Sequence, residues 1–123
     1  MIPRKNSIPT KQFPAVLKGP SLHGAYFRTV VSDTIPDNKP HIAIIIPKKH
    51  AKLATERNLF KRAINMEIVK QMDILPNKTF VFMMQKSIPY EKTIPGRKQV
   101  ATELARDAQQ IVIQIIKKYG KAT

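Results

Sequence analysis

Apolar residues gather along the chain in short runs that are typical of buried strands. Residues 23–31 are rich in aromatic and β-branched side chains, residues 41–46 are apolar after an opening histidine, and residues 79–84 read TFVFMM. Runs of this length, bounded by proline, asparagine and aspartate, favour strands. We therefore predict three strand segments, with turns at residues 32–40 and 76–77.

Helical spacing marks two long segments and one short one. Residues 53–71 contain no glycine or proline, which favours a long helix. A short helix is predicted over residues 10–17, with Thr10 as its N-cap. Residues 98–119 form the clearest amphipathic helix, because apolar side chains recur there at the i, i+4, i+7 spacing. These side chains are Val100, Leu104, Ala108, Ile111, Val112, Ile115 and Tyr119. Residues 87–96 hold two prolines and one glycine and are predicted to be a loop.

The resulting order, α-β-β-α-β-α, predicts an α+β fold in which helices pack on a small, mainly antiparallel sheet. Either two or three strands precede the second helix, since the first strand segments can be divided. A chain of 123 residues is long enough for one core, so we expect residues 1–123 to be a single domain. Residues 1–9 include two prolines and are expected to be a flexible arm.

Charge and composition narrow the class of protein. The chain has 22 Lys and Arg against 8 Asp and Glu, a formal net charge of +14, and no cysteine. Disulfides, thiol catalysis and cysteine zinc sites are excluded. The longest apolar run is far shorter than the ~20 residues of a membrane span, and no signal peptide precedes it, so we expect a cytoplasmic protein. Because the basic residues are spread from Arg4 to Lys121, nucleic acid is a better partner than a membrane surface.

The densest positive charge lies in residues 47–62, which contain six basic residues and one acidic residue. On a helical wheel that starts at Arg57, Lys61 lies at about 40°, Asn58 at about 100° and Arg62 at about 140°. The apolar side chains of the predicted helix occupy the opposite arc, from about 180° to 340°. They are Leu59, Phe60, Ala63, Ile64 and Met66. One face therefore offers cations and amides that suit phosphates and 2′-hydroxyls, and we expect both arginines there to be dispensable for folding.

These residues resemble the signature of the bacterial ribonuclease P protein component. The signature has a strand that ends in Lys-Lys, a short basic loop and then Ala-x-x-Arg-Asn-x-x-Lys-Arg, which residues 48–62 match. The resemblance extends over residues 10–118 through Phe13, Val16, Gly19, Gly24, Tyr26 and Phe27. The chain departs from the family at Leu59, Asn65, Asn77 and Thr79, and the first two replace basic residues.

The resemblance implies that an RNA subunit carries the active site, with Mg²⁺, and cleaves precursor tRNA to leave the mature 5′ end. The protein would be an accessory subunit that is inactive alone and binds no cofactor itself. It also implies a left-handed β-α-β crossover through the second long helix. The residues implied to contact the catalytic RNA are Lys48, Lys49, Lys52, Arg57, Asn58, Lys61 and Arg62. Those implied to contact the 5′ leader of precursor tRNA are Phe13, Val16, Tyr26, Phe27 and Arg28. An equal alternative is that Tyr26 or Phe27 belongs to the core, because adjacent strand residues point to opposite faces of a sheet.

Two alternatives follow from the residues themselves. Histidine-based cleavage of RNA needs two imidazoles close together, and no spacing ties His23, His41 or His50 to one another. A ribosomal or general RNA-binding protein fits the charge and size equally well, but it does not explain the ordered Lys-Lys, Arg-Asn and Lys-Arg pairs. DNA and membranes are not expected partners.

Overall fold

The structure is a computed structural model that describes residues 18–32, 40–76 and 78–119. Its elements are β1 (Ser21–His23), β2 (Phe27–Ser32), β3 (His41–Ile45), α2 (Ala54–Lys70), β4 (Thr79–Met84) and α3 (Ile94–Tyr119). The helix expected at residues 10–17 and the arm expected at residues 1–9 lie outside the described residues, and so do Phe13 and Val16.

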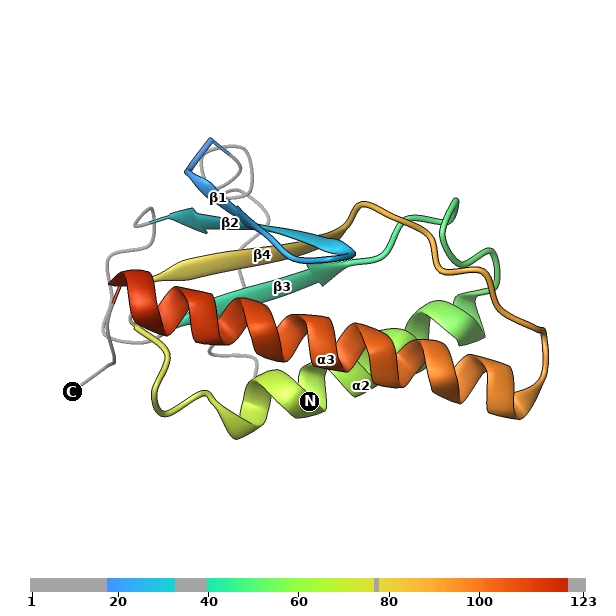
Figure 1. Cartoon of the computed structure of the whole chain (residues 1–123). Helices are drawn as coiled ribbons and strands as arrows, with labels where there is room; N and C mark the ends of the chain where they lie inside the picture. The colour runs from blue at the N-terminus through green and yellow to red at the C-terminus, as the bar shows by residue number, and fades with distance from the viewer. Residues whose placement is uncertain (1–17, 33–39, 77, 120–123) are drawn as a thin grey trace.

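The four described strands form one mixed sheet in the order β1-β2-β4-β3. β1 pairs with β2 and β2 with β4 in antiparallel fashion, whereas β3 and β4 are parallel. The sheet is therefore mainly antiparallel, as predicted, and three strands precede α2. Both helices lie against one face of the sheet, with α3 beside α2 (Figure 1).

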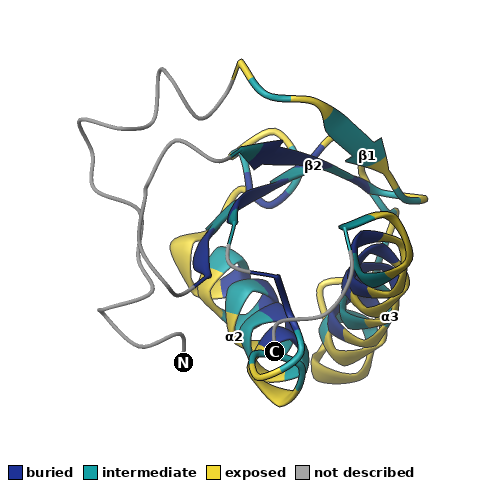
Figure 2. Cartoon of the chain, turned by 90° about the vertical axis from the view of Figure 1, so that its left-hand side faces the viewer, coloured by how far each residue is buried: buried dark blue, intermediate teal, exposed yellow. Residues whose placement is uncertain are grey.

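The main core fills the space between this face and the two helices, and Figure 2 shows the buried residues of α2 and α3 turned toward the sheet. Alternate strand residues point into this space, as the pleat requires. They include Phe27 and Val31 of β2 and Phe80, Phe82 and Met84 of β4. On the opposite face, Val30 pairs with Val81, and both are completely buried in a second, small apolar cluster.

The connection from β3 through α2 to β4 is left-handed. The two parallel strands are neighbours, and α2 returns antiparallel to them on the face that also carries α3, as Figures 1 and 2 together show. Nearly all such connections in proteins are right-handed. The observed hand is the one that the family resemblance implies.

The structure corrects two predicted boundaries. Residues 23–31 are not one strand, because β1 ends at His23 and the chain turns back into β2 at Phe27. In addition, α3 begins at Ile94 rather than at residue 98, so the end of the predicted loop is helical. The Thr93 hydroxyl accepts a hydrogen bond from the Gly96 N–H at 3.1 Å and caps this end. Pro95 is tolerated because backbone N–H groups in a first helical turn have no partner within the helix.

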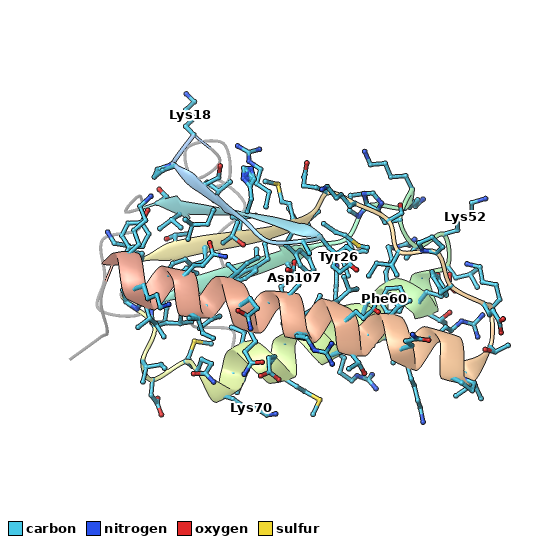
Figure 3. All side chains as sticks on the ribbon, in the orientation of Figure 1. Lys18, Tyr26, Lys52, Phe60, Lys70 and Asp107 are labelled. Carbon is cyan, nitrogen blue, oxygen red and sulfur yellow. The ribbon has the colours of Figure 1, made fainter. Side chains whose placement is uncertain are left out.

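Asp107 holds the β1–β2 turn against α3. Its buried carboxylate accepts hydrogen bonds from the backbone N–H groups of Ala25 at 2.7 Å and of Tyr26 and Phe27 at 3.0 Å each. A Cβ atom on Gly24 would lie 2.5 Å from the Asp107 Oδ1 atom, so only glycine fits there. Figure 3 shows Asp107 on α3 close to Tyr26. A carboxylate that receives three N–H groups is fully used in fixing this corner of the sheet.

We predict that Asp107→Ala lowers the free energy of unfolding by about 2 kcal/mol, because three backbone N–H groups, of which the Phe27 N–H is buried, lose a charged acceptor. Urea denaturation measures this loss. Glu103→Ala, one turn earlier on α3, removes the same charge and is the control. Equal losses in the two variants would contradict the structural role of Asp107.

Gly24 lies so close to the Asp107 carboxylate that a double-mutant comparison tests the same contact. Gly24→Ala should destabilise the native chain, but much less in the Asp107→Ala background, where the clashing oxygen is gone.

Candidate nucleic-acid interface

The first part of the predicted interface is the basic loop between β3 and α2. Lys48, Lys49 and Lys52 are exposed on it, and the His50 N–H closes its turn onto the Pro47 carbonyl at 3.0 Å. Figure 3 shows Lys52 projecting from this loop away from the core. No ion pair joins these three ammonium groups to any described residue, so their charge is directed at solvent.

The second part is the outward side of α2. Asn58, Lys61, Arg62, Asn65 and Met66 are its described residues around one hollow of about 630 Å³. Asn58 and Arg62 are exposed, and Lys61 is half-buried. The structure thus brings three of the sequence-predicted residues together. The amide of Asn65, which replaces a basic residue of the family pattern, lies in the same hollow.

Arg57 is placed differently from the sequence expectation. The buried side of α2 runs through Glu56, Phe60, Ile64 and Ile68, and Arg57 lies at its margin, half-buried. Its Nη1 atom donates to the carbonyl oxygens of residues 51 and 52 at 2.9 Å each. The sequence did not predict these contacts, through which the guanidinium joins the basic loop to α2, and they give Arg57 a structural role beside any role in binding RNA.

A buried carboxylate anchors the same end of α2. Glu56 is 1% exposed and lies 3.2 Å from the Lys92 ammonium and 3.1 Å from the Arg97 guanidinium. Burial alone would raise the pKa of Glu56, but hydrogen bonds with Tyr90, Arg97, Lys92 and the Leu53 N–H lower it to about 2. This anion therefore does not neutralise the basic face but ties α2 to α3. The sequence signal for it was a lone acid at N3, where a side chain can cap the Leu53 N–H.

The residues expected to contact the leader fall on both faces of the sheet. Phe27 is 1% exposed and points into the main core, so its expected stacking on RNA is wrong. Arg28 points to the opposite face, across from His23 and Met83. Tyr26 is half-buried, and with Arg28, His23 and Lys86 it borders a shallow hollow of about 170 Å³. Tyr26 and Arg28 therefore remain available to a ligand.

The histidines do not form a catalytic pair. His41 is 5% exposed in β3, and His23 is exposed on the edge strand β1. The Nδ1 atom of His50 hydrogen-bonds the Ser87 hydroxyl, and its Nε2 atom is closed off from solvent. Burial, and then the charge of Lys49, lowers the pKa of His50. The described residues contain no cluster of three or more His, Asp or Glu side chains that would bind a metal ion.

No helix among the described residues has the length and apolar character needed to cross a membrane.

The chain is similar to ribonuclease P proteins in sequence and in fold. The family model described as Ribonuclease P matches residues 3–105. The Vibrio campbellii ribonuclease P protein component is 34% identical over 59 residues, which are 48% of this chain and 50% of that protein. The chain thus matches about half the length of this curated relative.

Two solved structures share the fold. The Staphylococcus aureus RNase P protein superposes with a TM-score of 0.69 at 18% identity, over 89% of this chain and 93% of that one. The Thermotoga maritima RNase P protein gives a TM-score of 0.61 at 18% identity, over 93% and 94%.

We predict that Arg57→Ala lowers the free energy of unfolding by about 1–2 kcal/mol, because two carbonyl groups lose a charged donor. Arg62→Ala is the matched control, since it removes the same side chain from an exposed site of the same helix, and it should change stability by less than ~0.5 kcal/mol. Urea denaturation of both variants distinguishes them. Similar losses for both would contradict the anchoring role of Arg57.

We also predict that Glu56 makes the stability of the chain depend on pH. A carboxyl whose folded pKa is about 2 instead of 4.5 stabilises the fold fully above the higher value and loses this effect as pH falls toward the lower one. Glu56→Gln should therefore destabilise the protein most near neutral pH. Its difference from the native chain should shrink as the solution is acidified below about pH 4.5.

Denaturant titrations over a series of pH values test this prediction. Glu91→Gln, at an exposed carboxyl beside Lys92, is the control. A Glu56→Gln effect that is the same at every pH would show that the carboxylate charge is not what holds the helices together.

Proposed function

The chain belongs to the ribonuclease P protein family, and on this premise we propose that it is the protein subunit of the ribonuclease P ribonucleoprotein. In this proposal the protein docks on the catalytic RNA and on the 5′ leader of precursor tRNA. It thereby supports the endonucleolytic cleavage that matures the 5′ end of tRNA. The site of action is the cytoplasm.

The observation that carries the proposal is the unneutralised face of α2 and its preceding loop. Asn58, Lys61 and Arg62 border one hollow, and the nearby Glu56 is turned inward against Lys92 and Arg97. An arginine fork and a lysine suit phosphate oxygens, and the amides suit 2′-hydroxyls and base edges. Lys48, Lys49 and Lys52 extend the same positive field along the loop, as long-range attraction to RNA requires.

A second surface is proposed for the single-stranded leader. Tyr26 offers part of a ring, and Arg28, His23 and Lys86 offer cationic or hydrogen-bonding groups around the same shallow hollow. Aromatic rings beside cations bind single strands with little sequence preference. Phe13 and Val16 stay in the proposal on the strength of the family resemblance alone. Arg28 and the outward side of α2 serve opposite faces of the sheet, so one protein can contact both RNAs at once.

In this proposal the chemistry of cleavage belongs to the RNA subunit, which brings Mg²⁺ to the reacting phosphate. The protein contributes binding energy and positive charge, which lower the magnesium concentration that the RNA needs. It has no nuclease activity alone.

Reconstitution with a bacterial ribonuclease P RNA tests the proposal. We expect the protein to stimulate 5′ processing of a precursor tRNA at low magnesium. Arg62→Ala should weaken assembly with the catalytic RNA by about 1–3 kcal/mol whichever substrate is present. Tyr26→Ala with Arg28→Ala should weaken binding of precursor tRNA but leave mature tRNA, which lacks the leader, nearly unaffected.

The outcomes are distinct. Preferred binding to ribosomal RNA, without stimulation of processing, would identify a ribosomal or general RNA-binding protein instead. Cleavage by the purified protein alone would overturn the accessory role. Equal weakening of both tRNA substrates by the Tyr26 and Arg28 changes would move the leader site elsewhere.

A further inference from the structure

A groove runs between α2 and α3 on the side away from the sheet, and neither the signature motif nor the leader surface accounts for it. Its volume is about 490 Å³. Ala63, Ala101 and Ala105 are its smallest lining residues, and their side chains end at Cβ, which leaves the space between the helices open. The other lining residues are Met66, Glu67, Lys70, Lys98, Thr102, Arg106 and Gln109.

The groove is positively charged, and two of its three cations have no acidic partner. Lys70 forms an ion pair with Glu67 at 3.6 Å. Lys98 and Arg106 are exposed on α3 and make no ion pair with any described residue. No acidic side chain in the described part of the chain compensates their charge. Thr102 and Gln109 add exposed polar groups on the same side of α3.

The groove is continuous with the proposed RNA-binding side of α2. Met66 lines both the groove and the hollow that contains Asn58, Lys61 and Arg62. Its side chain is 57% exposed and forms the ridge between them. An RNA strand that leaves the α2 hollow over this ridge meets Lys98 and Arg106 next.

We propose that the α2–α3 groove is a second docking site for the catalytic RNA, in which a stretch of its phosphate backbone lies between Lys98 and Arg106. The inference rests on the proposed function and extends it, because it makes α3 a direct RNA-binding element. The groove suits the phosphate backbone of an RNA better than its bases, because its lining offers cations and small polar groups and no aromatic ring among the described residues. It also supplies positive charge that the signature helix lacks at Leu59 and Asn65.

The test is a set of binding titrations between the full-length protein and a bacterial ribonuclease P RNA at several salt concentrations. Lys98→Ala with Arg106→Ala should weaken binding about tenfold and make the salt dependence less steep, since two phosphate contacts are lost. The control is Lys117→Ala with Lys118→Ala, which removes the same charge from exposed sites in the last turn of α3, outside the groove. It should weaken binding much less.

A variant that leaves the charge of the protein unchanged tests whether the RNA enters the groove or is only attracted by its positive charge. Ala105→Leu narrows the groove without changing charge, and it should weaken binding as well. Unfolding curves for each variant establish that the chain still folds.

Each result has a defined meaning. If the Lys98 and Arg106 changes weaken binding no more than the control, while Arg62→Ala still weakens it, the groove is not a docking site and the proposed function stands. If Ala105→Leu binds like the native chain, charge acts only at a distance and the groove proposal is overturned. If Arg62→Ala also binds normally, the proposed function itself fails.

Discussion

The contact between Asp107 and the β1–β2 turn is the constraint on which the arrangement of the two surfaces depends. One carboxylate on α3 accepts hydrogen bonds from three consecutive N–H groups that lie 80 to 82 residues earlier in the chain. The bond from the Phe27 N–H is buried, and leaving that group unpaired would be costly. By fixing the three N–H groups, Asp107 sets where β2 begins. It therefore determines that Phe27 enters the core while Arg28 faces the other way.

Glu56 forms a second link between distant segments, at the N-terminal end of α2. Its buried carboxylate pairs with Lys92, just before α3, and with Arg97 in the first turn of α3, and it joins both to the first turn of α2. Arg57, the next residue, then holds the basic loop through two carbonyl groups. A buried ion pair is a weak source of net stability, but breaking one leaves a charge without compensation. The network is thus better understood as fixing the geometry of α2 and its loop.

These two carboxylates also explain how a chain with net charge +14 keeps its positive field available. Acidic residues are scarce, and Asp107 and Glu56 are turned inward to backbone groups or to cations of α3. Lys48, Lys49, Lys52 and Arg62 consequently have no anionic partner among the described residues. Self-repulsion among exposed cations opposes the folded state, and a polyanion that binds across them relieves it. The inward placement of these two carboxylates therefore leaves the exposed cations available for the proposed RNA partner.

The sequence alone predicted three of the four described strands, both long helices and the proximity of Asn58, Lys61 and Arg62, because these follow from the pattern within one segment. It missed the short edge strand β1, which is separated from β2 by a turn. It predicted the buried side of α3 correctly, but it placed the margins of the buried side of α2 wrongly. The wheel placed Arg57 on the polar face and left Met66 on the apolar one, yet Arg57 is half-buried and Met66 exposed. Helical periodicity gives only the angles between side chains around the helix axis. Packing against the sheet and α3 decides which of those side chains are buried. The roles of Asp107 and Glu56 were hidden for a related reason: their partners are distant in sequence, so only the tertiary structure brings them together.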